Sequence, residues 1–198
     1  MRKGDWLGTR SGKRFYPLDP QPEDVDLKDI ALALSRICRF NGHTKKFYSV
    51  ADHCLNVQQY LSLYGASTKI QLYGLLHDAS EAYVCDIPKP LKIHLVGYSE
   101  IEKGVQKAIY EAFALPEPYP IEEEFVKHAD QYIFAVEAKE LMNVTADWKL
   151  AKVPLGEVAP SYQKAEKLYL HMVKALLFKF KEEEKEIKRI VEQAEANS

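Results

Sequence analysis

Apolar residues recur at helical spacing along most of the chain, and proline and glycine cluster in the segments between them. Residues three and four positions apart share one face of an α-helix, so these runs predict amphipathic helices. The predicted helices cover residues 23–40 (or 27–40), 47–64, 68–84, 99–113, 121–142 and 161–192. Strand signals are weak, and only residues 14–16 predict a short strand. The sequence therefore predicts an all-α helical bundle with an irregular N-terminal segment.

Capping residues and prolines set several of these bounds. Asp26 and Ser49 are predicted N-caps, because their side-chain oxygens can accept hydrogen bonds from free N–H groups of the first turn. Gly65 is predicted to end the second helix. The third helix is expected to stop before Pro88, which has no N–H and restricts the residue before it. Residues 143–160 are predicted to be irregular.

The last helix changes character along its length. Its first half carries an apolar face, whereas residues 179–186 are nearly all charged. A segment with no apolar stripe is usually a solvated face or a projecting end. We therefore expect one domain over residues 1–178 and a long charged C-terminal helical extension over residues 179–198.

Composition excludes several protein classes. The chain has 198 residues, with 27 Lys and Arg against 29 Asp and Glu. A net charge of −2 argues against a protein that binds a nucleic-acid polymer through bulk charge. No apolar stretch approaches the roughly 18 residues of a membrane span, and no signal peptide is visible. The three cysteines have no CxxC spacing and read as reduced thiols. We expect a cytoplasmic protein without a membrane partner.

One short segment combines three ionisable residues beside buried apolar positions. His77 and Asp78 follow a Leu-Leu pair, and Glu81 lies four and three positions further on. On a helix these spacings place Glu81 on the same side as the His-Asp pair. Ionisable groups on an inward-leaning patch are costly unless something compensates them, and a divalent cation does so directly. Adjacent His and Asp residues also occur by chance on solvated helices.

Two further residues are candidate ligands of the same cation. His53 lies on the preceding predicted helix and Asp130 on a later one, each beside apolar residues. Together with His77 and Asp78 they offer two imidazoles and two carboxylates, which suit Mn²⁺, Fe²⁺, Co²⁺, Mg²⁺ or Zn²⁺. Four protein ligands leave coordination positions for water and substrate, as catalytic metal sites require.

The order His53, His77-Asp78, Asp130 resembles the H…HD…D signature of HD-domain metal-dependent phosphohydrolases. The segments around residues 38–44, 47–53 and 77–92 resemble its bacterial 5′-deoxynucleotidase branch, most of all phage and prophage members of the YfdR type. The similarity covers about residues 11–178 and is most specific over residues 38–92. The 24-residue interval between the first two histidines is shorter than in better-known deoxynucleotidases. A differently shaped nucleotide pocket is therefore expected.

The resemblance assigns roles residue by residue. It implies that the four ligands bind one metal, and that Glu81 and Asp86 are catalytic carboxylates near the attacking water. Glu81 would order or deprotonate the water, and Asp86 would protonate the leaving 5′-oxygen if confinement raises its pKa. Asp86 has the alternative of a cap or turn residue before a proline. Arg39 takes the place of a nucleotide contact, with an internal salt bridge as the alternative.

Three more residues have open alternatives as substrate contacts. His43 is expected to meet a phosphate oxygen or to hydrogen-bond its own loop. Lys89 and Lys92 would attract a phosphate chain from the loop after the site, or remain ordinary exposed lysines.

The expected activity is hydrolysis of deoxynucleoside 5′-monophosphates in a homo-oligomer, a dimer or larger. One alternative is a dNTP triphosphohydrolase or nucleotide pyrophosphohydrolase, with a channel lined by Lys89 and Lys92 or by Lys45 and Lys46. The other is a non-catalytic helical interaction module in which a metal is only structural.

Overall fold

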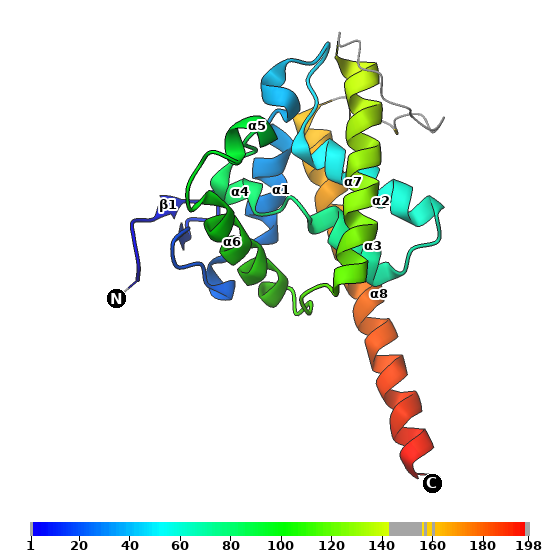
Figure 1. Ribbon diagram of the computed structural model, residues 1–198. Helices are drawn as coiled ribbons and strands as arrows, with labels where there is room; N and C mark the ends of the chain where they lie inside the picture. The colour runs from blue at the N-terminus through cyan, green and yellow to red at the C-terminus, as the bar shows by residue number, and fades with distance from the viewer. Residues whose placement is uncertain (1, 143–155, 157, 160, 197–198) are drawn as a thin grey trace.

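The computed structural model describes residues 2–142, 156, 158–159 and 161–196, which are mainly helical (Figure 1). In chain order the helices are α1 (Leu27–Arg36), α2 (Val50–Leu63), α3 (Thr68–Leu76), α4 (Glu81–Val84), α5 (Lys89–Lys92), α6 (Tyr98–Ala112), α7 (Pro120–Leu141) and α8 (Tyr162–Ala196). Short 3-10 turns cover Pro22–Asp24 and Arg39–Gly42. The strands β1 (Leu7–Gly8) and β2 (Arg14–Phe15) form a small antiparallel hairpin.

The core lies where α2 meets α3, α7 and α8, and α8 also packs against α1. Apolar side chains from these helices are fully buried, among them Leu34, Val50, Leu72, Leu76 and Tyr169. Burial of one such side chain stabilises the fold by about 1.5–3 kcal/mol. Since α2, α7 and the turn that follows α3 carry the candidate ligands, the core fixes the site.

Most of the predicted helices are confirmed. Ser49 caps α2 in a capping box with Asp52, and Asp26 caps α1 by accepting from the Lys28 N–H. Gly65 follows α2 with a left-handed φ of 74°. The observed α6 and α7 begin and end one residue before the predicted helices.

The predicted helix over residues 68–84 is wrong in one respect: α3 ends at Leu76, and α4 is a separate helix. The interruption has a visible cause in Gln106 of α6. Its side-chain N–H donates to the Leu76 carbonyl (2.9 Å), and its carbonyl accepts from the Ser80 N–H (3.2 Å). These two backbone groups would bond each other in a continuous helix. His77 and Asp78 therefore lie in a turn between two helices.

Two other predictions need correction. The first helix ends at Arg36, because the next residues pair with the strand-like segment before α2; Val50 N–H donates to the Ile37 carbonyl (3.1 Å). Lys89 and Lys92, expected on a loop, lie on the short helix α5, where Pro90 is tolerated in the first turn.

The irregular segment expected over residues 143–160 falls mostly outside the described residues. No helix in the described ranges is both long and apolar enough to cross a bilayer.

The last part of α8 projects away from the other helices (Figure 1). Its side chains from 181 to 195 are exposed, and neighbouring charges pair along the helix, as in Lys185–Glu182 and Arg189–Glu186 at 2.8 Å.

Removal of residues 186–198 is expected to leave the fold intact. Exposed ion pairs contribute little, so we expect a change in Tm of less than about 3 °C, measured by circular dichroism. A larger loss of stability, or a change in oligomeric state by light scattering, would show that this segment carries a contact.

Candidate metal centre

Four side chains from three parts of the chain meet at one point. His53 comes from α2, Asp130 from α7, and His77 and Asp78 from the turn after α3. The two imidazole Nε2 atoms are 3.3 Å apart. The Asp130 Oδ1 lies 3.1 Å from His53 Nε2 and 3.8 Å from His77 Nε2. The Asp78 Oδ2 lies 3.1 Å from His77 Nε2 and 3.7 Å from His53 Nε2.

These spacings fit a shared cation. Ligand atoms about 2.1 Å from an ion stand about 3.0 Å apart at adjacent octahedral corners and about 3.4 Å apart in a tetrahedron. The donor atoms of His53, His77 and Asp130 all lie within 4.8 Å of one another, and Asp78 joins through His77 in a second group with Cys54. Burial raises the pKa of the Cys54 thiol to about 11, so the imidazoles and carboxylates are the better donors.

The backbone and a buried acid orient both rings. The Nδ1 of His77 lies 2.8 Å from the Gly74 carbonyl, which fixes it as the donor. The Nδ1 of His53 lies 2.7 Å from the Oε1 of Glu137. A neutral imidazole with a donating Nδ1 has its lone pair on Nε2. Both rings therefore direct a ligand atom at the cluster.

The cluster holds its acids ionised. In the metal-free protein, burial favours the neutral form of Asp130, but hydrogen bonds from the protonated His53 and His77 rings outweigh it and lower its pKa well below the ordinary value. Burial opposes the charge on Asp78 too, yet His77, His53 and Arg39 lower its pKa. Metal binding requires ionised carboxylates, so both acids are in the state that a cation needs.

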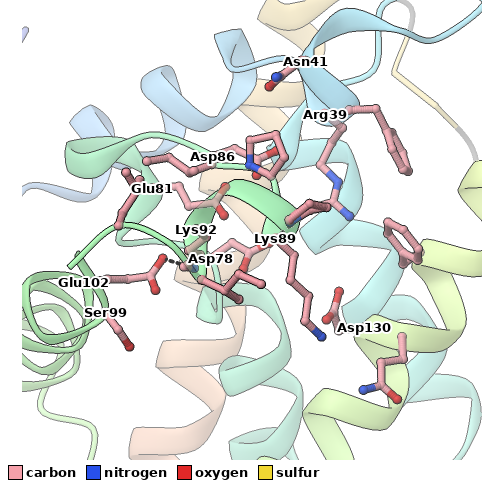
Figure 2. Close-up of a pocket in the computed structure, with 18 of the residues that line it drawn as sticks. Arg39, Asn41, Asp78, Glu81, Asp86, Lys89, Lys92, Ser99, Glu102 and Asp130 are labelled. Atoms are coloured by element: carbon pink, nitrogen blue, oxygen red, sulfur yellow. Dashed lines mark hydrogen bonds and ion pairs between the residues drawn. The ribbon is translucent and has the colours of Figure 1, made fainter. Parts of the chain in front are cut away.

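A cavity of about 1040 Å³ opens beside the cluster. Asp78, Asp130, Glu81, Asp86 and Arg39 line it, together with the α5 segment (Figure 2). Its volume is at the upper end of the range for small-molecule sites.

A second cavity, of about 690 Å³, reaches His77 and Asp130 from another side. Its lining includes Lys103, Lys107 and Lys127. The cluster is therefore accessible from two directions.

Glu81 and Asp86 both have raised pKa values. Burial is the main cause for each, and the negative charge of Asp78 adds to it. Glu81 is 7% exposed and begins α4. Its Oε2 is buried without a hydrogen-bond partner in the described part of the chain. A raised pKa is what an acid needs to exchange protons near neutral pH.

Arg39 forms the internal salt bridge that was one of its two predicted roles, and it also lines the cavity. Its Nη2 lies 3.2 Å from the Oε2 of Glu137, and its Nη1 lies 3.8 Å from the Oδ2 of Asp78. Its Nε is buried and has no partner among the described residues. The guanidinium therefore keeps one donor that no described group satisfies, and nucleotide contact stays a prediction.

The remaining residues predicted to contact substrate, Lys89, Lys92 and His43, differ in their position relative to the cavity. Lys89 and Lys92 line the cavity, but Lys92 already pairs with Glu102 at 2.6 Å (Figure 2). His43 is exposed and is not among the residues described as lining this cavity, so its role stays a prediction.

The two alternative lysine pairs of the triphosphate hypothesis line different cavities. Lys45 and Lys46 line a separate cavity of about 350 Å³, so they do not extend the channel that Lys89 and Lys92 border.

The sequence did not single out Glu137 or Gln106. Glu137 lies seven positions after Asp130, on the same face of α7, and this spacing was the signal available in the sequence. Its burial is visible only in the structure. Gln106 carried no signal, because its role depends on where α6 packs.

The chain matches no protein-family model. It is 39% identical over 136 residues to the Escherichia coli (strain K12) protein named "Uncharacterized protein YfdR", across 69% of this chain and 72% of YfdR. It is 35% identical over 146 residues to an uncharacterized protein of Rhodobacter capsulatus, across 70% of this chain and 74% of that protein. This degree of identity and coverage shows that the chain belongs to the family of YfdR.

Proposed function

We propose that this protein is a divalent-metal-dependent phosphohydrolase that removes the 5′-phosphate of deoxynucleoside monophosphates. The observation that carries the proposal is the convergence of the Nε2 atoms of His53 and His77 with the carboxylates of Asp78 and Asp130, at separations of 3.1–3.8 Å. The substrate class and the HD-domain type rest on the sequence resemblance.

His53, His77, Asp78 and Asp130 would hold the cation. Their mixed nitrogen and oxygen donors suit Mn²⁺, Fe²⁺, Co²⁺, Mg²⁺ or Zn²⁺. When bound, such an ion neutralises phosphate oxygens and lowers the pKa of a coordinated water.

The carboxylates beside the ligands would move the protons. Hydrolysis forms a bond from a water oxygen to phosphorus and breaks the bond to the 5′-oxygen, so one proton leaves the water and one reaches the departing oxygen. Glu81, whose buried Oε2 has no partner among the described residues, is the candidate to receive or orient the first proton. Asp86, whose pKa is raised chiefly by burial, is the candidate to deliver the second.

Arg39 would orient the substrate. Glu137 and Asp78 hold its guanidinium at the cavity wall, and its Nε, which has no partner among the described residues, is a charged donor for a phosphate oxygen.

Hydrolysis of nucleoside triphosphates is the second candidate. It is favoured by the second cavity, which Lys103, Lys107 and Lys127 line together with His77 and Asp130 of the cluster. A chain of phosphates could extend there, although Lys107 already pairs with Glu117 at 3.1 Å.

A phosphate-release panel tests the proposal. Deoxynucleoside monophosphates, ribonucleoside monophosphates and dNTPs are each assayed with Mn²⁺, Co²⁺, Mg²⁺, Fe²⁺ or Zn²⁺. We expect inorganic phosphate from the deoxynucleoside monophosphates with at least one metal. Chelator treatment should remove the activity and re-addition of that metal should restore it, because the acids require the cation to act on a phosphate anion. Release of pyrophosphate or triphosphate would favour the second candidate.

Turnover of no substrate with any metal would favour a non-catalytic module. In that case thermal unfolding is measured with and without the metal. A higher Tm in the presence of the metal would show that the ion stabilises the fold.

A further inference from the structure

Glu137 is a fully buried acid beside the metal cluster (0% exposed), and the proposed reaction assigns it neither a proton transfer nor a metal bond. It lies two turns after Asp130 on α7, so one face of this helix carries both residues. A buried carboxylate needs hydrogen-bond donors or a counter-charge, or its desolvation is very costly. The partners of Glu137 therefore show what the position is built to hold.

The two carboxylate oxygens of Glu137 contact different partners. The Oε1 accepts from the Tyr48 hydroxyl (2.7 Å) and lies 2.7 Å from the Nδ1 of His53. The Oε2 accepts from the Arg39 Nη2 (3.2 Å). The Oε1 thus faces the candidate metal ligand His53, and the Oε2 faces the Arg39 guanidinium at the cavity wall.

The oxygen next to His53 decides which ring nitrogen carries the proton. A carboxylate only accepts, so it requires Nδ1–H and leaves the Nε2 lone pair toward His77 and Asp130. His77 reaches the same state through a different partner, the Gly74 carbonyl. The two rings are therefore oriented independently.

We infer that Glu137 is a positioning residue that fixes His53 as an Nε2 ligand and at the same time anchors Arg39 at the cavity. This inference rests on the proposed function, since it assumes that His53 binds a metal.

Glu137→Gln provides the test, because the change keeps the shape and removes one acceptor. The Arg39 guanidinium only donates, so it should draw the new amide carbonyl toward itself. The amide NH₂ then faces the Nδ1 of His53, which must become an acceptor, and the ring proton moves to Nε2. The metal-directed lone pair of His53 is lost.

Two readouts follow this change. Mn²⁺ binding, measured by the electron paramagnetic resonance signal of free Mn²⁺, should weaken about 10- to 100-fold. Nitrogen NMR of labelled histidine in metal-free protein, at alkaline pH where both rings are neutral, should show His53 changing from the Nδ1–H to the Nε2–H form. His77 should keep its form and serves as the internal reference.

Matched controls separate positioning from packing. Tyr48→Phe removes the other donor to the same oxygen, and Asp29→Asn alters a buried acid of α1 that accepts from Ser11. Both should lower stability without changing the His53 tautomer or weakening Mn²⁺ binding more than about threefold, well below the effect of losing a ligand-orienting group. If Glu137→Gln fails to fold, Glu137→Asp, which keeps the charge but shortens the reach to His53, should give a mixture of tautomers.

An unchanged His53 tautomer in the Glu137 variants would overturn the inference, as would an equal loss of Mn²⁺ affinity in Tyr48→Phe. Absence of Mn²⁺ binding by the wild-type protein would instead count against the proposed function, and the tautomer comparison would still decide the role of Glu137.

Discussion

Asp78→Ala is expected to abolish phosphate release with every metal in the panel. The Asp78 carboxylate lies 3.1 Å and 3.7 Å from the two imidazole Nε2 atoms, and it also faces the Arg39 guanidinium at 3.8 Å. Its removal takes one of two negative charges from a site that must hold a divalent cation. Loss of about 4 kcal/mol of transition-state stabilisation corresponds to about a thousandfold lower rate.

The measurement is inorganic phosphate release at saturating metal, together with Mn²⁺ affinity of the same preparation. Glu124→Ala is a suitable control, because Glu124 is an exposed acid on α7 whose ion pair with Lys127 is at the surface. It should retain wild-type activity. If Asp78→Ala keeps more than about one-tenth of the wild-type rate, less than 1.4 kcal/mol has been lost and the proposed metal mechanism is wrong.

Most of the long helices were predictable because they carry signals in their own sequence. Ser49 with Asp52 marks the start of α2, and two prolines precede α7, which itself begins with a proline and an acidic first turn. These features depend on residues that are neighbours in the chain, so tertiary packing changes them little.

The turn at His77 was not predictable, because its cause lies in another helix. The backbone groups that would continue α3 through Ser80 bind instead to Gln106, 26 residues further along the chain. Gln106 thereby sets the direction of His77 and Asp78 through packing rather than through local preference. The role of Glu137 was not predictable for a related reason. Its hydrogen-bond partners Tyr48, His53 and Arg39 are far from it in the sequence. Sequence identifies candidate ligands well, but the groups that orient them depend on the assembled fold.

Glu81→Gln is expected to lower kcat by about 10²- to 10⁴-fold while leaving Mn²⁺ affinity nearly unchanged. The Glu81 carboxyl is buried at the start of α4, and burial together with Asp78 and Asp86 raises its pKa. Its Oε2 has no partner among the described residues, so this oxygen is available to the proposed reaction. Glutamine keeps the size but cannot take a proton, which separates chemistry from packing.

Comparison of kcat for Glu81→Gln and Asp86→Asn on two substrates shows which proton transfer each acid performs. A deoxynucleoside monophosphate expels an alkoxide and needs an acid, whereas 4-nitrophenyl phosphate expels a much weaker base and does not. If Asp86 protonates the leaving oxygen, Asp86→Asn should slow the nucleotide far more than the nitrophenyl ester. If Glu81 serves the water, Glu81→Gln should slow both substrates alike, because both need the same nucleophile. Equal behaviour of the two variants would reject this division of roles, and wild-type kcat in both would show that neither acid takes part in catalysis.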